Sequence, residues 1–139
     1  MEQFTGRHFV AFRTGLFRDE LADDELDRRS LGGDCAKWLD SKVLTAEGVA
    51  PGVDPLEEDW GWTFGVRVHG VWFWINVWCS LQQRKGWIIG IEPRPGLLGA
   101  FRRQRTESAK AGLCAAIDMA LASTPEITGR QWLDKHPEL

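Results

Sequence analysis

The clearest pattern along the chain is an alternation of large and small residues that begins at Trp60. From Trp60 to Val68, every second residue is large and apolar, and the residues between are Gly, Thr or Arg. This period of two is typical of a strand with one buried face. His69-Gly70 interrupts the alternation. The mostly apolar segment that follows, Val71 to Cys79, is predicted to form a second strand. Because Gly supplies a positive φ at the second central position of a two-residue turn, we expect the two strands to form a hairpin.

A two-residue turn at His69-Gly70 fixes the register of this hairpin. One face pairs only apolar residues, so it is expected to be the main core face: Val68 with Val71, Val66 with Phe73, Phe64 with Ile75, and Trp62 with Val77. The other face pairs Arg67 with Trp72, Gly65 with Trp74, Thr63 with Asn76, and Gly61 with Trp78. An indole can cover the bare backbone of a glycine on the neighbouring strand. Arg67 above Trp72 predicts a cation–π contact.

Further strands are predicted before and after the hairpin. Arg7 to Arg13 is a short apolar segment between glycines, and Trp87 to Glu92 ends at a proline. The segment Ile127 to Leu139 is expected to form a short strand or helix. Val49 to Pro55 contains Gly52 and two prolines, so it is predicted to be a loop.

Two helices are predicted from apolar residues at helical spacing. The first runs from Asp34, as N-cap, to Glu47, and the second from Thr106 to Ser123. The acidic stretch Asp19 to Asp27 predicts a solvated loop or a short surface helix. Together these elements predict a single α+β domain over residues 1–139, with an antiparallel sheet of four to five strands flanked by two main helices.

Composition narrows the functional classes. The chain has eight Trp and no Tyr. Its formal net charge is -3, and this negative charge argues against a dedicated nucleic-acid binder. It has no predicted secretory signal or membrane span. The three widely spaced cysteines are expected to be buried thiols in a reducing cytoplasm, and no metal or cofactor is predicted. The basic run Arg102, Arg103 and Arg105 is expected to be a solvated face or to meet acidic groups.

The indoles of Trp72, Trp74 and Trp78 allow two interpretations. The favoured one is that the sheet is covered on both sides, with one of the two helices lying over these side chains. The alternative is that part of this face is open and binds a partner, because aromatic patches of that size mark interaction sites.

Three carboxylates, Glu57 to Asp59, lead directly into Trp60, Gly61 and Trp62. Beside an aromatic wall, Glu58 and Asp59 could bind a sugar or a cationic ligand, with Trp38 at the mouth of the pocket. They could also act as a general acid and base. The favoured interpretation is that they are solvated loop carboxylates, one of which fixes the loop or pairs with an arginine. Adjacent strand residues point to opposite faces, so the second role requires Asp59 to lie in a loop.

The segments Gly33 to Leu39 and Glu58 to Trp62 resemble a group of small uncharacterised bacterial proteins. These share a GxDxAxWL helix followed by an EDWGW sequence at the start of a strand. The resemblance covers about the first two-thirds of the chain and implies a bacterial, cytoplasmic protein. The group has no assigned activity, so the resemblance implies no catalytic role for any residue.

Three hypotheses for function follow. The first is a non-enzymatic protein-interaction module, such as an adaptor or an immunity-type inhibitor, that uses a Trp-rich surface. The second is a small-ligand binding protein with a Trp/carboxylate pocket, and the third is a hydrolase that uses Glu58 and Asp59. A homodimer is also possible if Trp87 to Glu92 is an open edge strand. The candidate binding residues are Trp38, Glu58, Asp59, Trp60, Trp62, Arg67, Trp72, Trp74 and Trp78.

Overall fold

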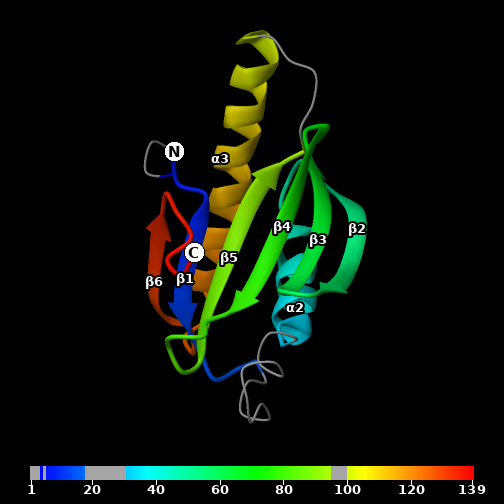
Figure 1. Ribbon diagram of the computed structural model, residues 1–139. Helices are drawn as coiled ribbons and strands as arrows, with labels where there is room; N and C mark the ends of the chain where they lie inside the picture. The colour runs from blue at the N-terminus through cyan, green and yellow to red at the C-terminus, as the bar shows by residue number, and fades with distance from the viewer. Residues whose placement is uncertain (1–3, 5, 18–30, 95–99) are drawn as a thin grey trace.

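The computed structural model describes residues 4, 6–17, 31–94 and 100–139, and their architecture is α+β. Six antiparallel strands form one sheet in the order β2-β3-β4-β5-β1-β6 (Figure 1). The elements in chain order are β1 (Phe9–Arg13), α2 (Gly33–Val43), β2 (Val49–Glu58), β3 (Gly61–Val68), β4 (Val71–Cys79), β5 (Gly86–Pro93), α3 (Ala100–Ala122) and β6 (Thr128–Leu133). The predicted class is confirmed, but the sheet is larger than four to five strands.

Strand β2 is the element that the sequence did not predict. The segment around Gly52 was expected to be a loop, yet it pairs antiparallel with β3 through two irregularities in register. Pro51 and Pro55 lack a backbone N–H, and a proline is tolerated in a strand that has a neighbour on one side only. The predicted strand Trp87 to Glu92 is part of β5, which is an interior strand because it lies between β4 and β1. The expectation of an open edge there is wrong, because the two edges are β2 and β6.

The hairpin of β3 and β4 forms as predicted. Its register runs from Val68 opposite Val71 to Trp62 opposite Val77. His69 has a φ of 48° and Gly70 a φ of 83°, so both central residues of the turn have the positive φ of a type I′ turn. The predicted core face is also confirmed, since it is fully or almost fully buried at Phe64, Val66, Val68, Phe73, Ile75 and Val77.

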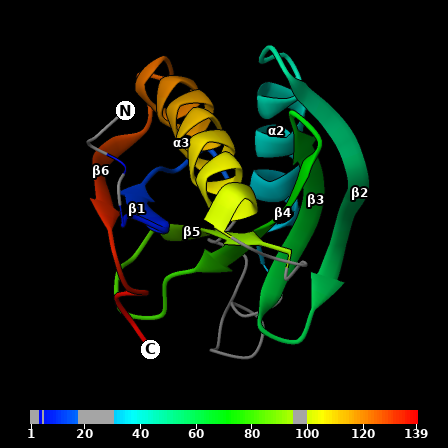
Figure 2. The ribbon, with the colours of Figure 1, turned by 90° about the horizontal axis from the view of Figure 1, so that it is seen from above.

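Both helices lie on the same face of the sheet, which curves around them (Figure 2). Apolar side chains of α2 and α3 join the core face of the strands in one hydrophobic cluster. The expectation that a helix covers the Trp72, Trp74 and Trp78 face is therefore wrong for the part of the chain that the structure describes. The apolar helix residues in the cluster are Cys35, Ala36, Leu39, Val43, Ala109, Leu113, Cys114, Ile117 and Leu121.

The helix ends differ from the predicted ones. Asp34 is not the N-cap of α2: Gly32 holds that position with no side-chain bond, and Asp34 lies in the first turn. A carboxylate there is still favourable because it faces the positive end of the helix dipole. Helix α3 begins at Ala100, six residues before the predicted start, so Arg103 and Arg105 belong to the helix. The acidic stretch Asp19 to Asp27 lies outside the described residues.

The cysteine thiols are buried, as the sequence predicted. Cys35 and Cys114 are helix residues in the hydrophobic cluster, and Cys79 ends β4. Burial raises the pKa of the Cys35 thiol above its usual range and that of Cys114 to about 12. Since the thiolate is the reactive form, the raised pKa values of Cys35 and Cys114 disfavour a nucleophilic role for these two thiols.

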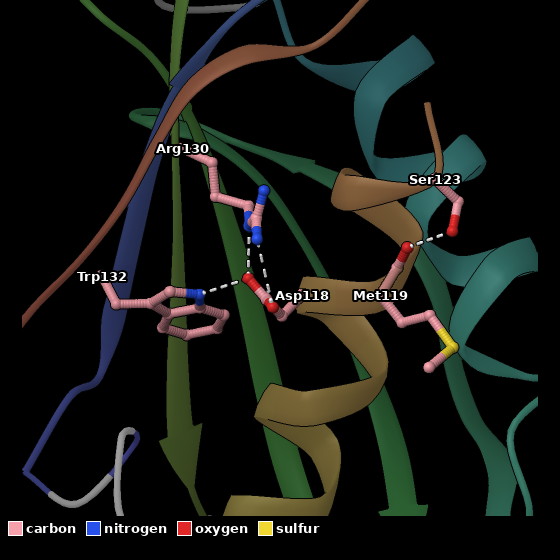
Figure 3. Close-up of polar contacts among 5 residues, drawn as sticks. All are labelled: Asp118, Met119, Ser123, Arg130 and Trp132. Atoms are coloured by element: carbon pink, nitrogen blue, oxygen red, sulfur yellow. Dashed lines mark hydrogen bonds and ion pairs between the residues drawn. The ribbon is translucent and has the colours of Figure 1, made fainter. Parts of the chain in front are cut away.

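Helix α3 is attached to the edge strand β6 by a carboxylate (Figure 3). Asp118 accepts a hydrogen bond from Nε1 of Trp132 at 2.9 Å and from Nε of Arg130 at 2.5 Å. One turn further on, the Met119 carbonyl accepts hydrogen bonds from both the backbone N–H of Ser123, at 2.9 Å, and the Ser123 hydroxyl, at 2.7 Å. The edge strand is thus held by directional bonds as well as by its pairing with β1.

The contact at Asp118 gives a prediction about stability. Substituting Asp118→Ala leaves the guanidinium of Arg130 and the indole N–H of Trp132 without their acceptor. Hydrogen bonds to charged groups contribute about 1.5–3 kcal/mol each, so the free energy of unfolding in urea should fall by roughly 2 kcal/mol. Glu126→Ala, an exposed carboxylate between α3 and β6, serves as the control and should change it little. Equal losses in both variants would contradict the role assigned to Asp118.

Candidate interaction surface

The face of the sheet that points away from α2 and α3 is called the outer face here. It carries the second side-chain set of the central hairpin, in the predicted pairing of Arg67 with Trp72 and Gly65 with Trp74. Trp72, Trp74 and Trp78 are half-buried, although no helix of the described chain lies over them. Their ring contacts are made by neighbouring strand side chains, by the turn before β3 and by the segment after β6.

Glycines below Trp72 let its ring lie flat on the sheet. A Cβ added to Gly52 of β2 would come within 2.6 Å of the Trp72 ring, and one added to Gly65 within 3.0 Å. The Trp74 ring, centred 6.3 Å from that of Trp72, also borders Gly65. The sequence suggested that an indole covers Gly65, but it did not reveal Gly52, because the strand that carries this glycine was not recognised.

Two guanidinium groups lie beside Trp72. The Cζ atoms of Arg67 and Arg94 are each 5.7 Å from the centre of its ring. The contact of Arg67 confirms the prediction, whereas Arg94 follows β5 and was not among the predicted site residues. Arg67 donates to the Pro51 carbonyl at 3.3 Å, and neither guanidinium forms an ion pair with any residue that the structure describes. Trp72, Trp74, Arg67 and Arg94 are called the Trp72 surface below.

A polar strip separates the Trp72 surface from the other aromatic group of the outer face. The Thr63 hydroxyl donates to Oδ1 of Asn76 at 2.8 Å, and Nδ2 of Asn76 donates to Glu92 at 3.4 Å. These three residues lie on neighbouring strands β3, β4 and β5. The strip therefore limits the Trp72 surface on the side toward Trp78.

The second aromatic group gathers around Trp78. The ring of Trp60 lies 5.0 Å from that of Trp78, and the His136 ring meets Trp78 edge-on at 4.6 Å. Trp60 was expected on the core face with Trp62. It instead precedes β3, in the turn after β2, where strand alternation does not apply, and it is 38% exposed. His136, from the segment after β6, was missed because nothing in the sequence places that segment over β4.

Two further predicted tryptophans belong to the helix side of the sheet. The Trp62 ring lies against the start of α2, where a Cβ on Gly33 would approach it within 2.9 Å. Trp38 of α2 packs against Phe17, with ring centres 5.5 Å apart. Glu58 and Asp59 are exposed at the turn between β2 and β3. The predicted binding residues therefore do not form one site. Among them, five lie in the two aromatic groups of the outer face: Trp60, Arg67, Trp72, Trp74 and Trp78.

One titratable pair lies between α3 and β1, away from the outer-face groups. Lys110 is 2% exposed, and its Nζ lies 2.8 Å from Nδ1 of His8 and 3.9 Å from a carboxylate oxygen of Glu107. Burial, and then the charge of Lys110, lower the pKa of His8. A neutral His8 imidazole can accept a hydrogen bond from Nζ of Lys110 through Nδ1.

Among the described residues, no cluster of three or more His, Cys, Asp or Glu side chains could hold a metal ion. None of the helices that the structure describes is long and apolar enough to span a membrane. The chain matches no family model, no curated protein and no solved structure.

The two shifted histidines predict a loss of stability in mild acid. Burial lowers the pKa of His136 as well as that of His8, below the ordinary value of 6.5. The unfolded chain therefore binds more protons than the folded chain as the pH falls below 6.5, and folding stability is lost in that range. Urea unfolding should show a lower midpoint at pH 5.5 than at pH 7.5.

The double variant His8→Gln/His136→Gln provides the comparison for this prediction. Without the two imidazoles, the difference between the midpoints at the two pH values should shrink. A difference as large as that of the unchanged protein would show that other groups cause the acid sensitivity.

Proposed function

We propose that this protein is a non-enzymatic interaction module that uses the Trp72 surface to bind an acidic segment of another protein. The observation that carries the proposal is the position of two guanidinium groups at 5.7 Å from one partly exposed indole, on a sheet face that neither α2 nor α3 covers. An adaptor and an immunity-type inhibitor both work through such a surface without catalysis.

The residue types of the Trp72 surface support binding to a protein. Trp and Arg are the side chains that most often dominate the free energy of protein–protein binding. The glycines under Trp72 hold its ring close to the backbone, so little side-chain freedom is lost when a partner covers it. The paired guanidiniums keep that ring flanked by positive charge.

Charge complementarity defines the partner. Arg67 and Arg94 have no carboxylate partner in the described chain, and a guanidinium binds carboxylates through two parallel hydrogen bonds. In a partner segment, an acidic side chain would bind the guanidiniums, and a neighbouring aromatic residue or proline would pack on the indoles. The net charge of -3 and the small number of cations here favour a protein partner over nucleic acid.

The buried thiols support a bacterial, cytoplasmic setting for this function. Thiols persist in reducing compartments, and the resemblance to small bacterial proteins agrees with that setting. Since all four side chains of the Trp72 surface belong to one chain, binding of the acidic segment does not require a dimer.

A peptide-display selection against the purified protein tests the proposal. Selected peptides should be enriched in Asp and Glu next to aromatic residues or prolines, and they should change Trp fluorescence on binding. The double variant Arg67→Gln/Arg94→Gln should weaken binding at least about tenfold, because each charged contact contributes more than 1 kcal/mol.

A matched variant controls for the loss of two positive charges. Lys42→Gln/Arg103→Gln makes the same change on exposed positions of α2 and α3, and it should leave binding unchanged. Selection of peptides without acidic residues would overturn the proposal, as would equal weakening by both double variants. Tighter binding of a single-stranded oligonucleotide than of any peptide would also overturn it.

A further inference from the structure

A cavity of about 340 Å³ opens at the opposite end of the outer face from the β3–β4 turn. Its walls come from β1, β5 and β6, from the loop between β4 and β5, and from residues 137 and 138. Figure 1 shows the segment after β6 crossing in front of β1 at this place. The volume lies within the range of small-molecule sites, about 300–1,000 Å³.

Apolar and polar residues both line the cavity. Ala11 and Ile88 are partners across β1 and β5, and Ile88 is almost fully buried although it lies on the outer face. Arg13 and Gln131 extend the lining on β1 and β6, and Gln83 lies in the loop. In the described chain, the Arg13 guanidinium has no hydrogen bond or ion pair.

A carboxylate belongs to the same cavity and is fixed in place. One oxygen of Glu138 accepts a hydrogen bond from the Ser80 hydroxyl, and the other accepts from the backbone N–H of Leu81 at 2.9 Å. Ser80 also accepts the N–H of Gln83 at 2.9 Å, so the loop and the carboxylate form one bonded unit. Glu138 forms no ion pair with Arg13, although both line the cavity.

We propose that this cavity binds a small zwitterion of the amino-acid class. The carboxylate of the ligand binds the Arg13 guanidinium, and its ammonium group binds Glu138, whose two oxygens already accept hydrogen bonds from Ser80 and Leu81, so that each charged side chain gains a counter-charge. Gln83 and Gln131 supply further hydrogen bonds. This site is separate from the Trp72 surface, and it does not depend on the proposed protein partner.

Ligand-observed NMR on the full chain, with free amino acids at millimolar concentration, tests this site. Amino acids with small side chains should bind, whereas an amine without a carboxylate and a carboxylate without an amine should bind at least about tenfold more weakly, since each lacks one charged contact. Binding of all three ligand classes with equal affinity would overturn the proposal, and so would no binding by any amino acid.

Two variants assign the binding to the cavity. Arg13→Gln and Glu138→Gln should each reduce affinity at least about tenfold, because each removes one charged contact. Arg84→Gln alters an exposed cation of the same loop that does not line the cavity, and it should bind like the unchanged protein. Circular dichroism verifies that each variant is folded. Unchanged affinity in folded Arg13→Gln would overturn the assignment.

Discussion

One constraint governs this structure: the hairpin of β3 and β4 has a wholly apolar face that must be shielded from water. Phe64, Phe73 and Ile75 on that face are fully buried. Both helices meet the requirement from the same side, because their own apolar stripes need the same core. Neither helix covers the outer face of the central strands, and its indoles pack against guanidiniums, against His136 and against one another. The Trp72 surface is thus a consequence of how the core is covered.

Local sequence rules predicted the centre of the sheet correctly. The alternation in β3 and the two-residue turn at His69-Gly70 determine the register, because a shift by one residue would move every core side chain to water. The same rules failed at β2, where Pro51 and Gly52 have the composition of a loop. A strand at the edge can contain such residues, and only the position of the strand in the sheet explains them.

The candidate surface could be predicted in part, for a related reason. Arg67, Trp72 and Trp74 belong to one hairpin, so their proximity follows from its register. Arg94 and His136 reach the outer face from segments that the sheet order brings near β4, and periodicity does not reveal which strands are neighbours. Trp60 was placed on the wrong face because it lies in a turn, where alternation ends. Local sequence patterns also could not predict which face of the sheet the two helices cover, since this depends on how all elements pack into the core.

The position of β1 has a consequence for how the chain assembles. This strand lies between β5 and β6, so both of its neighbours come from much later in the sequence. During synthesis, Val10 and Phe12 must remain exposed until β5 has left the ribosome. Pairings over such a long sequence separation carry a large loop-closure cost and slow folding. Because β6 pairs only with β1, this side of the sheet can be completed only after the chain has been synthesised as far as β6.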